Sequence, residues 1–349
     1  MNPTTAIQRF VNLSDRDKMQ RISAMIRFAE QKLKRQFPFL SRQNLIGALV
    51  FLSAIAGMIF NGYLYYKEVI PAWLCVVGNA VWASLLHELE HDLIHQLYFR
   101  TRPLVQNLMM AGIWLFRGNL ISPWYRKFIH LVHHRESGQK EDIEERLIGN
   151  GLPWGFKRFM IMLDPILAPL QFKNLMKLPH FKLKDVLQAT FPIYLIFNTI
   201  WVSFLVLLII RAYALMTGLY VEPPFASWYV ALVEFMMVVY IAPNFIRQAS
   251  LSIVSSNCHY YGDIPKSNVI TQTQILQPWF LAPLQLFCFN FGSTHCIHHF
   301  VVNQPFYIRQ LVAPLAHAAM RRYGVRFNDI GTFQRGNRYE SEQINKNHS

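Results

Sequence analysis

Histidines in this chain have the spacing of metal ligands. Ten of the 13 histidines fall in four groups, and none of the groups contains a Cys-x-x-Cys pair. Neutral imidazole binds iron, zinc or copper, and the groups together exceed what one tetrahedral zinc ion can use. We therefore expect two metal ions in one basin, and histidine ligation without thiolates favours an oxygen-activating di-iron site. The groups are His87/His91/His95, His130/His133/His134, His259 and His295/His298/His299; His180, His317 and His348 stand apart and are predicted to be surface or structural residues.

The first group follows an apolar run and repeats at every fourth residue. On a helix, His87, His91 and His95 would share one face. The string His87-Glu88-x-x-His91 also matches the short zinc-protease motif, in which the glutamate is a general base. A polar end of an amphipathic helix is a third interpretation of the same string. We predict that His95, one turn further on, supports the site rather than binds metal.

Acidic residues lie close to the histidine groups. A ligating imidazole usually donates its other N–H to a carboxylate or carbonyl, which fixes its tautomer and orientation. We expect about half of these acids to act in this way and the rest to be solvated. The candidates are Glu88, Glu90, Asp92, Asp142, Glu144, Glu145 and Asp263.

The composition is that of a membrane protein. Of the 349 residues, 52% are hydrophobic and only 15% are charged, against about 25% in soluble domains. The net charge of +14 comes from basic segments that flank apolar runs. Such segments are typical of cytoplasmic loops near anionic lipid, so nucleic-acid binding is not expected. They could also dock an acidic redox partner.

Four apolar runs are predicted to cross the bilayer as two helical hairpins: residues 45–66, 71–86, 191–210 and 228–246. The two short connectors carry one basic residue each, Lys67 and Arg211, whereas the other segments carry the rest. The positive-inside rule therefore places both termini and all the histidine groups on the cytoplasmic side. Shorter apolar pieces at 104–116, 159–172 and 275–289 are predicted to be interfacial or re-entrant.

We thus predict an all-α integral membrane protein whose cytoplasmic helical cap carries the metal site. Residues 1–43 form an amphipathic segment with a helix starting at Ser14, either on the membrane surface or packed on the cap. Residues 44–330 form the catalytic membrane domain. Residues 331–349 are polar and predicted to be a disordered tail.

The histidine strings resemble those of a known family. His87-x3-His91, His130-x2-His133-His134 and His295-x2-His298-His299 are similar to the three histidine boxes of the membrane fatty acid desaturase/hydroxylase superfamily. His259-Tyr260-Tyr261-Gly262 resembles a string that carries an extra histidine in acyl-CoA desaturases. The order of the hairpins also matches, so the resemblance covers about residues 45–300.

This resemblance implies a non-haem di-iron centre that uses O₂ and two electrons to attack a C–H bond of a lipid chain in a tunnel. The substrate would be a fatty acid or acyl thioester, and a separate carrier such as a ferredoxin would supply the electrons. Ser255 stands where acyl-CoA desaturases have an asparagine that holds a metal-bound water. The metal ligands carried over by position are His87, His91, His130, His133, His134, His259, His295, His298 and His299.

Desaturation is the first reaction that the resemblance implies, with hydroxylation, ketone formation and terminal-alkene-forming decarboxylation as alternatives on the same scaffold. Two other classes of protein are weaker interpretations. An intramembrane zinc protease using His87-Glu88-x-x-His91 would leave the other clustered histidines without a role. A metal carrier or channel would place ionisable residues inside the spans, and the four runs are nearly free of charge.

Overall fold

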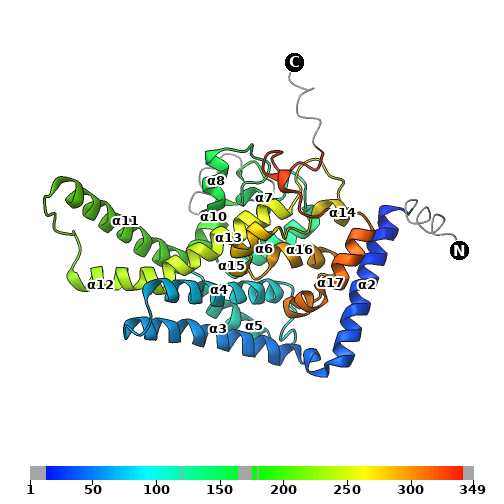
Figure 1. The fold of residues 1–349 in the computed structure, drawn as a ribbon, viewed down its shortest axis with the longest axis horizontal. Helices are drawn as coiled ribbons and strands as arrows, with labels where there is room; N and C mark the ends of the chain where they lie inside the picture. The colour runs from blue at the N-terminus through cyan, green and yellow to red at the C-terminus, as the bar shows by residue number, and fades with distance from the viewer. Residues whose placement is uncertain (1–12, 119–120, 164–174, 179–180, 341–349) are drawn as a thin grey trace, which may run out of the picture.

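The computed structural model describes residues 13–118, 121–163, 175–178 and 181–340. The described residues are helical, apart from turns, loops and two isolated backbone bridges. Four helices are long and apolar enough to cross a membrane, which confirms the predicted fold class (Figure 1). They are α3 (Gln43–Tyr66), α4 (Ala72–Ile94), α11 (Ile193–Thr217), and α12 (Ser227–Met236), which continues through the π-helical turn η3 (Met237–Ile241) into α13 (Ala242–Cys258).

Helices α3 and α4 form the first hairpin, and α11 and α12 form the second. Ala54 and Met58 of α3 pack against Ala83 and Leu86 of α4 in one buried cluster. Both α4 and α13 extend beyond the predicted apolar runs, to Ile94 and Cys258. Hydropathy ends these spans too early because it counts polar side chains as exposed, whereas here they are buried against other helices.

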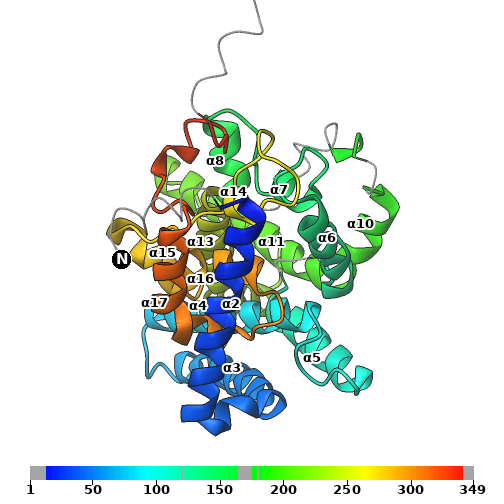
Figure 2. The same cartoon turned by 90° about the vertical axis from the view of Figure 1, so that its right-hand side faces the viewer.

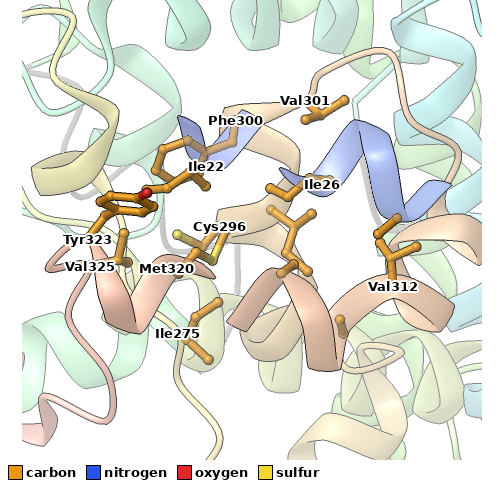
Figure 3. Close-up of a cluster of buried hydrophobic side chains, with 14 of the residues drawn as sticks. Ile22, Ile26, Ile275, Cys296, Phe300, Val301, Val312, Met320, Tyr323 and Val325 are labelled. Carbon is orange, nitrogen blue, oxygen red and sulfur yellow. The ribbon is translucent and has the colours of Figure 1, made fainter. Parts of the chain in front are cut away.

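The N-terminal helix α2 (Asp15–Gln36) begins where Ser14 accepts a hydrogen bond from the Asp17 N–H, as predicted. Its apolar face is buried against α17 (Phe306–Arg322), beside it in Figure 2. Figure 3 shows Ile22 and Ile26 in this core. Of the two predicted placements, the structure shows the second: the apolar face of α2 packs on the cap and is not available to enter the lipid.

Short helices match the predicted interfacial pieces where the structure describes them. Helix α5 (Pro103–Phe116) exposes Leu104 and Leu108, as an interfacial helix would. The second piece begins within α8 (Phe156–Leu163), and its residues 164–172 lie outside the described residues. The third piece is broken into η4 (Trp279–Leu281) and α15 (Ala282–Phe287).

The C-terminal segment differs from the prediction of a disordered tail for residues 331–340. Thr332 and Asn337 are both fully buried. Asn337 Nδ2 donates to the backbone carbonyl of His259 at 3.0 Å, and Thr332 Oγ1 donates to Asn257 at 2.9 Å. These polar side chains satisfy backbone and side-chain groups beside a histidine group, so a composition that reads as disordered folds onto the cap. Residues 341–349 lie outside the described part of the chain.

Candidate metal centre

Four helical segments bring the clustered histidines together from distant parts of the sequence. Helix α6 (Pro123–Glu136) and helix α16 (Phe291–Phe300) carry the two His-x-x-His-His strings. Helix α4 contributes from its last turn, and His259 follows the last residue of α13. Since each string spans little more than one helical turn, its members reach two neighbouring positions in space.

The first assembly is the five-ring group: His91, His95, His130, His134 and His298. One ring nitrogen from each lies within 4.8 Å of the others. The Nε2 atoms of His95 and His130 are 3.0 Å apart, and that of His134 lies 3.1 Å from His130. Nitrogens each about 2.1 Å from one ion and at right angles would be about 3 Å apart. The spacing therefore fits lone pairs that converge on a metal.

The second assembly is the four-ring group: His133, His259, His295 and His299. The Nε2 atom of His295 lies 3.0 Å from that of His259 and 3.0 Å from that of His299. All four side chains are buried. The two groups meet at α6, where His133 and His134 are consecutive, so the structure shows two adjacent sites in which the residues present fit a metal ion each.

Eight of the nine predicted ligands lie in these two groups, and the ninth, His87, lies in neither. His95, which was predicted to have only a supporting role, takes a place in the five-ring group. His87 Nδ1 lies 3.1 Å from Arg117 Nη2. His298 has a similar neighbour, since its Nδ1 lies 3.2 Å from Arg309 Nη1. His298 differs from His87 in that its Nε2 atom lies 3.0 Å from the Nε2 atom of another histidine, His134.

Three of the candidate acids lie on α7 (Ile143–Leu147) or at its N-cap, and they contact the Nδ1 atoms of histidines in the two groups. The Nδ1 atom of His133 lies 2.8 Å from Asp142, and that of His130 lies 2.7 Å from Glu144. Glu145 lies 3.3 Å from the Nδ1 atom of His259. These carboxylates fix the rings so that Nε2 is free to face a metal.

Three other candidate acids, Glu88, Glu90 and Asp92, form ion pairs with arginines. Glu88 and Asp92 each lie 3.1 Å from Arg309 Nη2, and all three side chains are buried. Glu90 pairs with two further arginines. Because Glu88 is held in an ion pair, it is not placed as a general base beside a metal-bound water, which argues against the zinc-protease interpretation. Asp263 instead accepts backbone hydrogen bonds from the C-terminal segment.

Electrostatics keeps most of the rings neutral. Burial, together with neighbouring imidazoles, lowers the pKa of His134 and His299, so their lone pairs are available at neutral pH. Burial also lowers the pKa of His95, to about 3. Burial acts in the same direction on His133, but the Asp142 carboxylate outweighs it and raises the pKa of His133 to about 10. The buried carboxylate thus strongly polarises that ring.

A cavity of about 240 Å³ reaches both groups from one side. Its metal-facing wall includes His91 and His130 of the five-ring group and three members of the four-ring group. The rest of the wall is mainly apolar, for example Ile129, Ile161 and Val186. The cavity can therefore receive an apolar chain and exclude water from the space beside the histidines.

Three histidines were expected to stand apart from the site. His317 Nε2 lies 2.8 Å from the carbonyl of Ser293, a structural hydrogen bond. His180 and His348 lie outside the described residues.

Comparison with known protein families identifies a matching family. The model of the family described as fatty acid desaturase matches residues 67–331, about three quarters of the chain. The matched residues include all four predicted histidine groups, and therefore both the five-ring group and the four-ring group. The comparison with curated proteins returned no match.

Proposed function

The chain belongs to the fatty acid desaturase family, and on that premise we propose that it is an O₂-dependent membrane oxidoreductase acting on a fatty acyl chain. The observation that carries the proposal is the pair of histidine groups beside an apolar cavity. Desaturation is the first reaction proposed; hydroxylation, ketone formation and terminal-alkene-forming decarboxylation are the alternatives.

We propose that each group holds one iron ion. His95 replaces His87 in the predicted ligand set, because its nitrogen lies within the five-ring group. When bound, the iron ions would supply the activation of O₂ for attack on an unactivated C–H bond. The proposed ligands are His91, His95, His130, His134 and His298 for one ion and His133, His259, His295 and His299 for the other.

The residues of the chain orient the rings and exclude water. Asp142 and Glu144 each accept from the Nδ1 atom of a ligand, which leaves Nε2 of His133 and His130 directed at the metal. The apolar wall, with residues such as Ile129 and Leu251, would hold the chain against the histidines. This positioning decides which C–H bond is attacked.

The proposed setting is an integral, multi-pass membrane protein with both termini in the cytoplasm. The distribution of Lys and Arg around the four spans supports this orientation. Electrons would come from a separate carrier such as a ferredoxin, which would approach the basic cytoplasmic cap. The lipid bilayer would deliver the substrate.

The test of the metal site compares His87 and His95, which lie one helical turn before and one helical turn after His91. Purified wild-type protein is expected to hold about two irons per chain by elemental analysis. His95→Ala should lower this number and His87→Ala should not, because only His95 belongs to a group of converging nitrogens. One zinc per chain, or iron loss confined to His87→Ala, would overturn the assignment.

The test of the reaction is product analysis by mass spectrometry after expression in a host of known lipid composition. A product lighter by two hydrogens indicates a desaturase, and a product heavier by one oxygen indicates a hydroxylase. A volatile alkene indicates a decarboxylase. Absence of any oxidised lipid from an iron-loaded protein supplied with a reductant would count against all of them.

A further inference from the structure

Two arginines, the buried Arg117 and the half-buried Arg126, share a single carboxylate beside the metal centre. Arg126 Nη1 lies 2.8 Å from Glu90 Oε2, and Arg117 Nη1 contacts the same oxygen. Burial lowers the pKa of Arg117 to about 10. The positive charge of Arg126 also lowers it, whereas the Glu90 carboxylate opposes both effects. Two guanidinium groups paired with one carboxylate leave excess positive charge at this position, and an excess buried charge is costly unless an anion offsets it.

His87 adds a hydrogen-bond donor at the same place. A guanidinium has donors only, so the Nδ1 atom of His87 must accept the hydrogen bond from Arg117. A neutral His87 then carries its proton on Nε2. His87 is only 2% exposed, it lines the cavity, and its Nε2 has no partner among the described residues. An unpaired buried N–H of this kind calls for an acceptor from a ligand.

Each of the two donors lies four residues before a histidine of the five-ring group. His87 precedes His91 by four residues on α4, and Arg126 precedes His130 by four residues on α6. Four residues correspond to about 6 Å along the helix axis. Both side chains line the cavity that also contacts the histidine groups. An anion between His87 and Arg126 would therefore lie only a few carbon atoms from the ligated metal.

We propose that the substrate is a free fatty acid, whose carboxylate binds between Arg126 and His87 at the metal-facing end of the cavity. This inference rests on the proposed function and names its substrate class. The alkyl chain extends along the apolar wall, and carbons 2 and 3 lie next to the metal centre. A thioester or glycerolipid offers no carboxylate, so it leaves the Nε2–H of His87 without an anionic partner and the charge of the second guanidinium without a counterion.

The reaction balances with O₂, two electrons from the carrier and two protons, written for the protonated acid. Loss of one hydrogen each from carbons 2 and 3 gives a 2-enoic acid and two waters. Insertion of oxygen gives a 2- or 3-hydroxy acid and one water. Cleavage of the bond between carbons 1 and 2, with loss of a hydrogen from carbon 3, gives a terminal alkene, CO₂ and two waters.

The deciding experiment is a ligand series on the wild-type protein, so that it does not depend on a variant that folds. Dodecanoic acid, its methyl ester and 1-dodecanol compete with a fluorescent fatty acid for iron-loaded protein in lipid nanodiscs. We expect the acid to compete at about 10- to 100-fold lower concentration than the ester or alcohol, from charge-assisted hydrogen bonds. Equal competition by all three would overturn the inference.

Variants locate the effect. Arg126→Gln and His87→Gln are expected to reduce the preference for the acid while the iron content stays unchanged. Lys127→Gln is the matched control, because Lys127 is the next residue on α6 and does not belong to the cavity wall. If Lys127→Gln reduces the preference as much as Arg126→Gln does, the site is wrong.

Regiochemistry separates this inference from the proposed function. Oxidation at carbon 2 or 3 of the free acid, or loss of its carboxyl group, is the expected result. Oxidation in the middle of an ester or thioester chain would refute the carboxylate site and leave the proposed function intact. A protein that binds no iron would refute the proposed function, while the same ligand series on the metal-free protein would still test the carboxylate site.

Discussion

The five-ring and four-ring groups are adjacent, but different helices build them. Helix α4 gives His91, and its C-cap gives His95, to the five-ring group, and neither contributes to the four-ring group. The four-ring group takes His259 from the end of α13 in their place. If both groups hold iron as proposed, the four-ring ion has more positions left for other ligands, as catalytic metal sites require. Three of its four histidines line the cavity.

The supports of the two groups differ as well. In the five-ring group, His130 is oriented by Glu144, whose side chain is 23% exposed. In the four-ring group, His133 is oriented by the fully buried Asp142. His259 is further held by the carbonyl of Ser255, at 2.8 Å. The four-ring group, which has fewer histidines, is therefore oriented by the more deeply buried carboxylate. Firmer orientation of its four rings would compensate for the absence of a fifth.

The largest expected effect comes from removing one ring from each group. His295→Ala leaves three rings in the four-ring group, and His298→Ala leaves four in the five-ring group. We expect iron to fall from about two to about one per chain in His295→Ala, with activity lost, and to fall by a smaller amount in His298→Ala, as in His95→Ala. Elemental analysis and an activity assay measure both. His317→Ala, which changes a histidine outside the groups, is the control. Equal iron loss in His295→Ala and His298→Ala would contradict the proposed difference between the two groups.

Much of this centre could be predicted from the sequence. Four long apolar runs predict the four spans, and the three histidine strings together with His259 give eight of the nine residues that the structure places in the two groups. The choice between His87 and His95 could not be predicted, because both share a helix face with His91. It depends on where α6 lies: His95 Nε2 is 3.0 Å from His130, a residue 35 positions away.

The buried arginines could not be predicted either. Arg117 and Arg309 are each almost fully buried, although arginine is normally an exposed residue. Their partners are acids on α4, and a pairing between helices is set by tertiary packing rather than by local sequence. Asn337 was missed for a related reason. Its polar, Gly-rich neighbourhood resembles a linker, yet its side chain serves backbone groups near His259.

An intermediate effect is expected from the carboxylates that orient each group. Asp142→Asn should weaken iron binding in the four-ring group by about 10- to 100-fold, since such supports typically contribute that much. Glu144→Gln should have a smaller effect, because Glu144 is partly exposed and solvent can replace it. Competition with a chelator measures both affinities. Glu141→Gln, an exposed acid next to Asp142, is the control; a larger effect in Glu144→Gln than in Asp142→Asn would contradict the proposed difference in support.

The smallest expected effect tests whether the C-terminal segment supports only the four-ring group. Asn337 donates to the carbonyls of His259 and Ser256, and its φ of 66° lies in the left-handed region. Asn337→Gly keeps that backbone conformation and removes the amide. We expect the free energy of unfolding to fall by about 1–3 kcal/mol, measured by denaturant titration in mixed micelles, with iron lost first from the four-ring group.

Gln334→Ala provides the matched control, because Gln334 is exposed in the same segment. It should change neither the free energy of unfolding nor the iron content, since surface substitutions of this kind usually stay within about 0.5 kcal/mol. Equal iron loss from both groups in Asn337→Gly would mean that the segment stabilises the cap as a whole. Selective iron loss from the four-ring group would show that Asn337 stabilises that group in particular, because its amide holds the backbone of His259 in place.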